Sequence, residues 1–307
     1  MNINIGTRGS LLALWQANMV AENLRKVGLT TNIITIETKG DKILDRSLAS
    51  IGSKGLFTEE IEEQLINKTI DIAVHSAKDM QSTLPQGMEI IAFTEREKSN
   101  DVLVSFDKTL TLTSDKPMII GTSSARRKAI LKYHYPKIET VEIRGNLQTR
   151  IRKMQEGHCQ AMILAYAGIH RMEYDDLINE ILDEEIFVPP VGQGCVAIEA
   201  HSSLDKTKKE MICQALNHIE TAMLVTEERK LLQNLDGGCS IPLFCKASIV
   251  NDQFEINAGL INHSKNIKIQ AKISEPIISY KSCVDKVIDE LENQNIHEIL
   301  NDIRLNV

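Results

Sequence analysis

The fold of this chain is decided by residues 118–165, which read MIIGTSSARRKAILKYHYPKIETVEIRGNLQTRIRKMQEGHCQAMILA. Three short apolar runs in this stretch are typical of strands, and the two longer polar runs between them are typical of helices. Strands that alternate with helices form a parallel sheet with helices packed on it. We therefore predict a βαβαβ unit of the α/β class, with strands at 118–122, 138–143 and 159–165 and helices at 123–134 and 146–155.

A similar alternation precedes this stretch. Apolar residues repeat at spacings of four and three after Ser10, which predicts a helix with Ser10 as its N-cap. A second helix is expected from Thr58 to about Asn67, because Glu59 and Glu60 in its first turn suit the helix dipole. The strands predicted around these helices are 2–7, 33–38, 71–75 and 88–93.

The pattern changes after residue 189. The segment PPVGQGCVAIEA (189–200) joins a proline and glycine hinge to an apolar strand, which we expect to return the chain to the first sheet. Helices follow at about 206–217 and 219–233, and then short strands and two helices form an α+β arrangement. We predict three domains: residues 1–95 with 193–213, residues 96–192, and residues 214–307.

The composition is that of a soluble globular protein, with 42% hydrophobic and 25% charged residues among 307. No apolar run approaches the ~18 residues that a membrane helix needs. The N-terminal sequence MNINIGTRGS lacks the basic and apolar regions of a secretory signal. We therefore expect a cytoplasmic protein that does not bind membranes.

The charge is unevenly distributed. The net charge of −7 and the 4% aromatic content argue against nucleic acid as a partner, because base stacking needs aromatic platforms. Residues 126–153, however, hold nine basic and two acidic residues, so this segment carries +7 and the remainder −14. This concentration of basic residues in one segment of an otherwise acidic protein indicates a binding site for a small anionic ligand.

Hydroxyl and guanidinium groups follow two successive strands of the decisive stretch. Together with backbone N–H groups at a helix start, such groups bind carboxylate or phosphate. One arginine in such a place is normally a solvated surface charge, but arginines at two successive strand ends favour a ligand site. The residues concerned are Thr122, Ser123, Ser124, Arg126, Arg127, Arg144 and Arg150.

The strand predicted at 71–75 delivers Lys78 and Asp79 just beyond its end. In open α/β sheets the ligand crevice lies outside the carboxyl ends of the strands, so a general acid or base is expected there. Considered alone, Asp79 is more often a turn or helix cap than a catalytic group, and Lys78 is more often a solvated surface charge than a ligand-binding group. Residues 39–55 lack any sustained period, which indicates either a functional lid or a plain connection.

One cysteine stands apart from the others. Cys239 lies in LDGGCSIP (235–242), where Gly237 and Gly238 allow a tight turn that would present the thiol to a cleft. The alternative is a small buried hydrophobic residue. The six cysteines, at 159, 195, 213, 239, 245 and 283, show no CxxC pair and no ligand spacing with histidine, so neither a disulfide framework nor a metal site is indicated.

The motifs RGSLLALWQ, HSAKD, GTSSARR, RGNLQTR, VGQG, ALNHIETA and LDGGCSIP, in this order, closely resemble those of the porphobilinogen deaminase (hydroxymethylbilane synthase) family, from about Asn4 to the C-terminus. The resemblance implies three α/β domains, of which the first two form a clam like a type II periplasmic binding protein and the third is small and α+β. It also implies a transferase of haem and other tetrapyrrole biosynthesis. Such an enzyme condenses four porphobilinogen molecules head to tail with loss of ammonia and releases hydroxymethylbilane by hydrolysis.

The resemblance also implies roles for single residues. Cys239 matches the cysteine that carries a covalent dipyrromethane cofactor, one per chain, through a thioether. Asp79 matches the catalytic aspartate, which assists loss of the aminomethyl nitrogen and stabilises the azafulvene cation that follows. The groups matched to cofactor binding are Lys78, Thr122, Ser123, Arg126, Arg127 and Arg144, and those matched to substrate binding are Arg8, Ser10, Lys54, Phe57, Arg150 and Arg171.

The chain departs from the family pattern at a few positions. Ser50 stands where many members carry a second lysine before the GKG of the lid, and Gln81 stands where many carry a proline after the KDM step. Cys195 replaces a small residue after VGQG and is interpreted as core.

Two other functional classes were weighed. A non-catalytic anion-binding module would use the same two-domain clam, but it would not need the third domain with its GGC turn. A nucleic-acid binder would use the basic segment, but it would lack aromatic platforms. The family expectation is a monomer with a small-molecule substrate and no bound metal.

Overall fold

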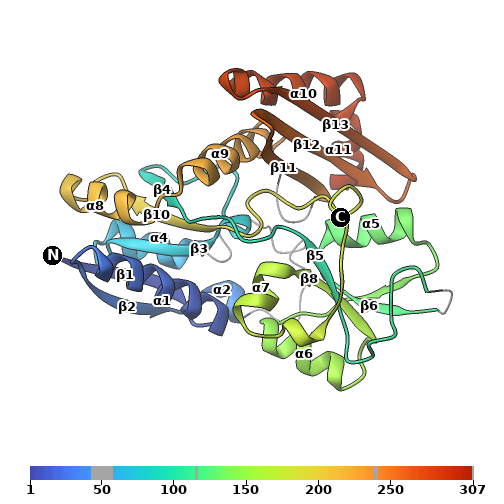
Figure 1. Ribbon diagram of the computed structural model, residues 1–307, viewed down its shortest axis with the longest axis horizontal. Helices are drawn as coiled ribbons and strands as arrows, with labels where there is room; N and C mark the ends of the chain where they lie inside the picture. The colour runs from blue at the N-terminus through green and yellow to red at the C-terminus, as the bar shows by residue number, and fades with distance from the viewer. Residues whose placement is uncertain (43–57, 115–116, 238–240, 306–307) are drawn as a thin grey trace.

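The computed structural model describes residues 1–42, 58–114, 117–237 and 241–305, and these residues form three separate sheets (Figure 1). The first sheet lies near the N-terminus, the second contains the decisive stretch, and the third belongs to the C-terminal part of the chain. The predicted α/β class, with two similar sheets followed by a small α+β unit, is confirmed.

The first sheet has the strand order β2-β1-β3-β10-β4. β1 is parallel to β2 and to β3, whereas β10 runs antiparallel to both of its neighbours. The return of the chain to this sheet by the strand after VGQG, as predicted, is confirmed. The strands are β1 (Asn2–Arg8), β2 (Thr30–Ile36), β3 (Ile72–Ser76), β4 (Met88–Phe93) and β10 (Val196–His201).

Helices cover both faces of the first sheet. On one face, α1 (Leu11–Lys26) packs Ala17, Val20 and Leu24 against the sheet, in one apolar cluster with residues of α8 (Lys206–Leu216). Ser10 caps α1 by accepting a hydrogen bond from the Ala13 N–H (3.3 Å), as predicted. On the other face lies α4 (Glu59–Ile66). The short helix α2 (Lys39–Lys42) follows β2 in the chain.

The second sheet has the order β7-β6-β8-β5-β9. β6 is parallel to β7 and β8, and β5 runs antiparallel to its neighbours β8 and β9. The predicted βαβαβ unit is therefore present. Its strands are β5 (Asp101–Val104), β6 (Ile119–Gly121), β7 (Glu139–Val141), β8 (Ala161–Ala165) and β9 (Ile178–Ile181), and its helices are α5 (Ala125–His134), α6 (Leu147–Gln155), α7 (Tyr166–Arg171) and the 3₁₀ turn η2 (Asp175–Leu177).

The two five-stranded sheets repeat one topology. In each, three parallel strands are followed in space by one antiparallel strand and then by an edge strand, and β5 takes the place in the second sheet that β10 takes in the first. Residues 94–100 and 182–195, which contain no strand or helix, carry the chain from one sheet to the other and back. We call these two segments the crossovers.

The third sheet is antiparallel, with the order β11-β12-β13. Its apolar face packs against α9 (Ile219–Asn234), α10 (Cys283–Asn293) and α11 (Ile296–Leu305) in one cluster that includes Phe254, Leu231 and Val287. The remaining elements are β11 (Leu243–Val250), β12 (Gln253–Asn262), β13 (Ile267–Pro276) and the 3₁₀ turn η3 (Ile277–Ser282).

A buried carboxylate links α9 to both crossovers. Glu228 accepts hydrogen bonds from the Arg96 guanidinium (2.6 and 3.3 Å), from the Gly192 N–H (2.8 Å) and from the Ala247 N–H (2.8 Å). Arg96 lies in the first crossover, Gly192 in the second and Ala247 in β11. One side chain therefore holds the C-terminal part of the chain against the junction of the two larger sheets.

Candidate active site

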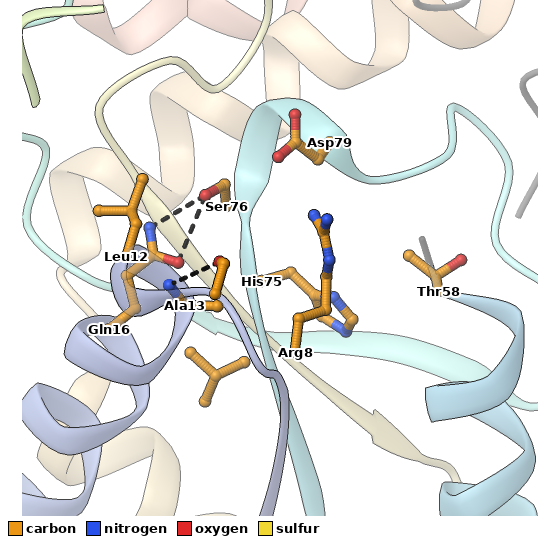
Figure 2. Close-up of a pocket in the computed structure, with 10 residues that line it drawn as sticks. Arg8, Leu12, Ala13, Gln16, Thr58, His75, Ser76 and Asp79 are labelled. Carbon is orange, nitrogen blue, oxygen red and sulfur yellow. Dashed lines mark hydrogen bonds between the residues drawn. The ribbon is translucent and has the colours of Figure 1, made fainter. Parts of the chain in front are cut away.

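Asp79 lies at the edge of the first sheet, where β1 and β3 both end. After β3, one 3₁₀ turn, η1 (Ala77–Asp79), buries Ala77 and leaves Asp79 exposed. Because β1 and β3 are parallel, Arg8 at the end of β1 reaches the same edge. Figure 2 shows the Arg8 guanidinium extending toward the Asp79 carboxylate. The structure thus brings an exposed acid and a cation together at the carboxyl ends of parallel strands.

An open cavity lies between these two residues and the start of α1. Gln16 on α1 donates to the Ser76 hydroxyl at 3.0 Å and accepts from it at 3.3 Å, which ties the helix to the end of β3 (Figure 2). Ser10, predicted to bind substrate, lines the cavity while its hydroxyl caps α1. The polar residues of the lining are Arg8, Ser10, Gln16, Thr58, His75, Ser76 and Asp79.

The carboxyl ends of the second sheet supply hydroxyl groups. Thr122 follows β6, and its side chain accepts from the Ser124 N–H at 3.3 Å. The Ser123 hydroxyl donates to the Ile143 carbonyl at 2.9 Å, and Ser124 caps α5. These bonds fix the loop between β6 and α5 against the end of β7. Cofactor binding by Thr122 and Ser123 stays a prediction.

Arg144 and Arg150 follow β7 as predicted. The Arg144 Nε donates to Glu142 Oε2 at 3.1 Å, and the Arg150 Nε donates to the Gly145 carbonyl at 2.7 Å. Burial lowers the pKa of Arg150 to about 10, and the charges of Arg127, Arg144 and Arg8 act in the same direction, while Asp79 opposes them. Cations from both sheets therefore lie close enough to repel one another.

Lys78 belongs to the same charge cluster. Burial lowers the pKa of Lys78 to about 8, Asp79 opposes this shift, and Arg127 and Arg150 add to it. Its Nζ lies 3.5 Å from Gln193 Oε1, at the limit of a hydrogen bond. Crowded cations of this kind are stabilised when an anion with several carboxylates binds among them.

Arg126 and Arg127 are placed differently from the other arginines. Both are buried and share Asp101, with Arg126 Nη2 2.6 Å from Oδ2 and Arg127 Nη2 2.7 Å from Oδ1. Burial opposes ionisation of Asp101, but the two guanidinium groups outweigh it and hold its pKa well below the ordinary range. Each guanidinium also donates to a backbone carbonyl, that of Val188 or Ile163. These hydrogen bonds and ion pairs are structural, and cofactor binding by the two arginines remains a prediction.

Arg171, also expected to bind substrate, lies at the second crossover. Its Nη2 donates to the Gly194 carbonyl at 2.7 Å, and its guanidinium stacks over the Trp15 ring at 5.4 Å. These contacts join α7 to the crossover and to α1.

The remaining predicted site residues lie outside the described residues. Cys239, Lys54 and Phe57 are among them, as are Ser50 and most of the segment 39–55. Of the chain that leads to Cys239, the structure describes α9 up to Asn234 and then Leu235 to Gly237. A Cβ on Gly237 would lie 2.7 Å from Leu232 Cδ1, so a larger residue here would have to displace the end of the Leu232 side chain.

Sequence reasoning missed the buried groups that support this site. Asp101 ends the charged run TEREKSND (94–101), which hides the fact that it is also the first residue of β5. Gln193, within VGQG, donates to the Ser99 carbonyl (2.6 Å) and to Asp101 Oδ1 (3.0 Å). Glu199 pairs with His75 at 3.1 Å inside the first sheet. The sequence signal that could have identified Asp101 and Glu199 was an acidic residue at the start of, or inside, an apolar strand.

Two family models match the chain, one after the other. The first, described as porphobilinogen deaminase, dipyromethane cofactor binding domain, matches residues 3–209, and the second, porphobilinogen deaminase, C-terminal domain, matches residues 222–293. This chain belongs to the porphobilinogen deaminase family. The resemblance predicted from the motifs is confirmed, and so is the dipyrromethane cofactor.

Curated members of the porphobilinogen deaminase family are similar over most of their length. The chain is 56% identical to porphobilinogen deaminase of Cytophaga hutchinsonii (85% of this chain, 83% of that protein) and 39% identical to that of Carboxydothermus hydrogenoformans (98% and 96%). Among solved structures it is similar to the periplasmic VFT2 domain of Bordetella pertussis BvgS, with a TM-score of 0.43 and 14% identity over 75% of this chain and 92% of that one. Within the described ranges, no helix has the length and apolar character needed to span a membrane.

Proposed function

We propose that this member of the porphobilinogen deaminase family uses Asp79 to condense four porphobilinogen molecules head to tail, with release of ammonia, and then releases hydroxymethylbilane by hydrolysis. This makes it a transferase of porphyrin biosynthesis. The observation that carries the assignment of residues is the meeting of one exposed acid, Asp79, with the cation Arg8 in one cavity at the strand ends of the first sheet.

The arginines suit the ligands of this reaction. Porphobilinogen and its oligomers carry acetate and propionate groups, and guanidinium groups bind carboxylates in a fixed orientation. Arg8, Lys78, Arg144 and Arg150 are the cations of the cluster that are not committed to Asp101. They hold the carboxylates, so the reacting carbon of each new substrate comes to the same place beside Asp79.

Asp79 handles the proton and the charge. As an acid, it protonates the aminomethyl nitrogen that leaves as ammonia. As a carboxylate, it then stabilises the positive charge that develops on the pyrrole and fades when the new carbon–carbon bond forms and a proton leaves the ring. Its exposure at the cavity, next to Arg8, allows both contacts.

The described residues fit the cofactor of the family. A dipyrromethane carries four carboxylate groups, and the cluster offers the cations Lys78, Arg144 and Arg150 while α9 leads the chain toward Cys239. When bound through the Cys239 thioether, the dipyrromethane supplies the pyrrole carbon to which the first substrate is joined. Ser123 and Arg144 hold its side chains, with Thr122 positioning the loop between β6 and α5.

The remaining expectations form part of the same proposal. The domain boundaries are those predicted from the sequence: residues 1–95 with 193–213, residues 96–192, and residues 214–307. The protein is a cytoplasmic monomer whose partner is porphobilinogen, without nucleic acid or membrane, and Lys54, Phe57 and Arg171 assist substrate binding. Light scattering of the purified chain tests the monomer.

The mass of the denatured protein tests the central assignment. We expect the purified chain to carry an added mass equal to two linked pyrrole units, and Cys239→Ser to lack it. Incubation of the unsubstituted protein with porphobilinogen should then yield hydroxymethylbilane. An unmodified chain that stays unmodified and forms no product would leave only an anion-binding module.

A further inference from the structure

Gln81 connects the turn that carries Asp79 to two helices. Its side-chain Nε2 donates to Thr58 Oγ1 at 3.0 Å and to Glu62 Oε1 at 3.2 Å, both at the start of α4. Its backbone carbonyl accepts a hydrogen bond from Arg229 Nη2 on α9 at 2.7 Å. The residue two positions after Asp79 is therefore held from both sides.

The turn itself has few bonds that would fix it. Within the described residues, the backbone bonds that Ala77 to Met80 donate outside regular elements are Ala77 N–H to the Cys195 carbonyl (3.0 Å) and Met80 N–H to the Ala77 carbonyl (3.3 Å). The chain leaves η1 in an extended conformation, with φ −72° and ψ 142° at Met80. Ala77 and Met80, on either side of the exposed Asp79, are buried in one apolar cluster, and the next side-chain hydrogen bonds that hold the chain after Asp79 are those of Gln81.

The partners of Gln81 are buried. Thr58, Glu62 and Arg229 are all more than 90% buried, so hydrogen bonds among them are little weakened by water. Burial raises the pKa of Glu62, and the amide of Gln81 counteracts this by donating to the carboxylate. Thr58 also lines the cavity that contains Arg8 and Asp79. The bridge made by Gln81 therefore ends at the wall of the active site.

We propose that Gln81 is a positioning residue for Asp79: its amide, clamped between Thr58 and Glu62, fixes the turn so that the Asp79 carboxylate faces the reacting group. The inference rests on the proposed role of Asp79. It also gives a physical meaning to Gln81 at a position where a proline was expected from the family pattern. A proline would stiffen the backbone through its ring, whereas Gln81 immobilises the same segment through its side chain.

The test compares Gln81→Met with Gln233→Ala in the cofactor-loaded enzyme. Methionine keeps the size of glutamine but cannot donate, so kcat should fall about tenfold while KM changes less than about twofold, because small displacements of a catalytic group cost much rate. Gln233 donates to the Ser82 carbonyl (2.9 Å) in the same segment but does not reach α4, so Gln233→Ala should leave kcat unchanged. Gln81→Asn, polar but one methylene too short for the bridge, should behave as Gln81→Met does.

Two further measurements separate positioning from general loosening. In the Asp79→Ala background, Gln81→Met should cause no additional loss of kcat, because there is no carboxylate left to orient. Amide hydrogen exchange of residues 77–82, measured on the chain before cofactor loading, should accelerate in Gln81→Met and not in Gln233→Ala. Melting temperatures of the variants ensure that each is folded at the assay temperature.

The outcomes distinguish this inference from the proposed function. If the unsubstituted chain forms no hydroxymethylbilane, the function itself is wrong. If it turns over normally and both Gln81→Met and Gln81→Asn match it, or if Gln81→Met lowers kcat equally with and without Asp79, only the positioning role is overturned.

Discussion

The two five-stranded sheets share one strand order but use buried and exposed charge in opposite ways. In the first sheet the strand ends expose an acid, Asp79, into the cavity. In the second sheet the acid Asp101 is fully buried and forms ion pairs with both Arg126 and Arg127. The strand ends of this sheet therefore present cations. One repeated frame thus presents an exposed acid beside Arg8 and Lys78 at the strand ends of the first sheet, and Arg144 and Arg150 after a strand of the second.

The largest expected effect is that of Asp79→Ala. Turnover of porphobilinogen should fall about 10³-fold, within the usual range for loss of a general acid, while ligand binding persists because the cations remain. The matched control is Glu142→Ala, an exposed acid of the second sheet paired with Arg144 and Lys128, which should change turnover less than about threefold. Comparable losses in the two variants would remove the distinction between the sheets.

Asp101→Asn should act on stability rather than on chemistry. It leaves two buried guanidinium groups without a counter-charge, and the free energy of unfolding should fall by about 3 kcal/mol. Glu89→Gln in the first sheet breaks a partly exposed pair with Lys209 (2.7 Å) and should cost less than about 1 kcal/mol. Urea unfolding of the unsubstituted protein and of the two variants measures both losses of unfolding free energy. Equal losses in the two variants would contradict the buried role of Asp101.

Arg150→Leu should weaken binding of substrate or of the growing chain about tenfold or more, with the fold retained. Arg152 offers a control on the same helix, since its side chain is 68% exposed and pairs only loosely with Glu156 at 3.7 Å. Arg152→Leu should therefore leave steady-state kinetics unchanged. If both variants behave alike, the second sheet does not hold the carboxylates.

The smallest expected effect concerns pH. The pKa of Lys78 is lowered to about 8, so its ammonium loses a proton, and hence its positive charge, as the pH rises through 8 in the free enzyme. Attraction for carboxylates then weakens, and kcat/KM should fall a few-fold between about pH 7 and 9. Lys78→Arg keeps its charge over this range, so its profile should be flatter. Identical slopes would show that Lys78 does not attract the substrate.

Much of the frame could be predicted from sequence periodicity. The helix capped by Ser10 was placed correctly because its apolar residues recur at spacings of three and four, and the strand 88–93 because it is a short, nearly continuous apolar run. β5 and β9 were missed, since each has four residues and β5 directly follows a charged run. Sheet order also escaped prediction, because an antiparallel central strand is set by pairing with residues far along the chain.

The site was predictable where strand ends alone determine it. Asp79 was expected at the end of the strand 71–75 from the sequence pattern, and it lies in the cavity; Arg8, which shares that cavity because β1 and β3 are parallel, was expected only from the family resemblance. Arg126 and Arg127 show the limit of that rule. Their partner Asp101 lies about 25 positions earlier, and sequence spacing does not tell whether a guanidinium faces a ligand or a buried carboxylate.

The repeated topology also imposes an order on synthesis. The strand that pairs with both β3 and β4 in the first sheet, β10, is translated only after every strand of the second sheet, from β5 to β9. On the ribosome the second sheet is therefore complete while β3 and β4 still lack the strand between them. Of the two five-stranded sheets, the one whose synthesis begins first is therefore completed second. The turn that carries Asp79 gains its neighbouring strand β10 only after the cationic sheet has been synthesised.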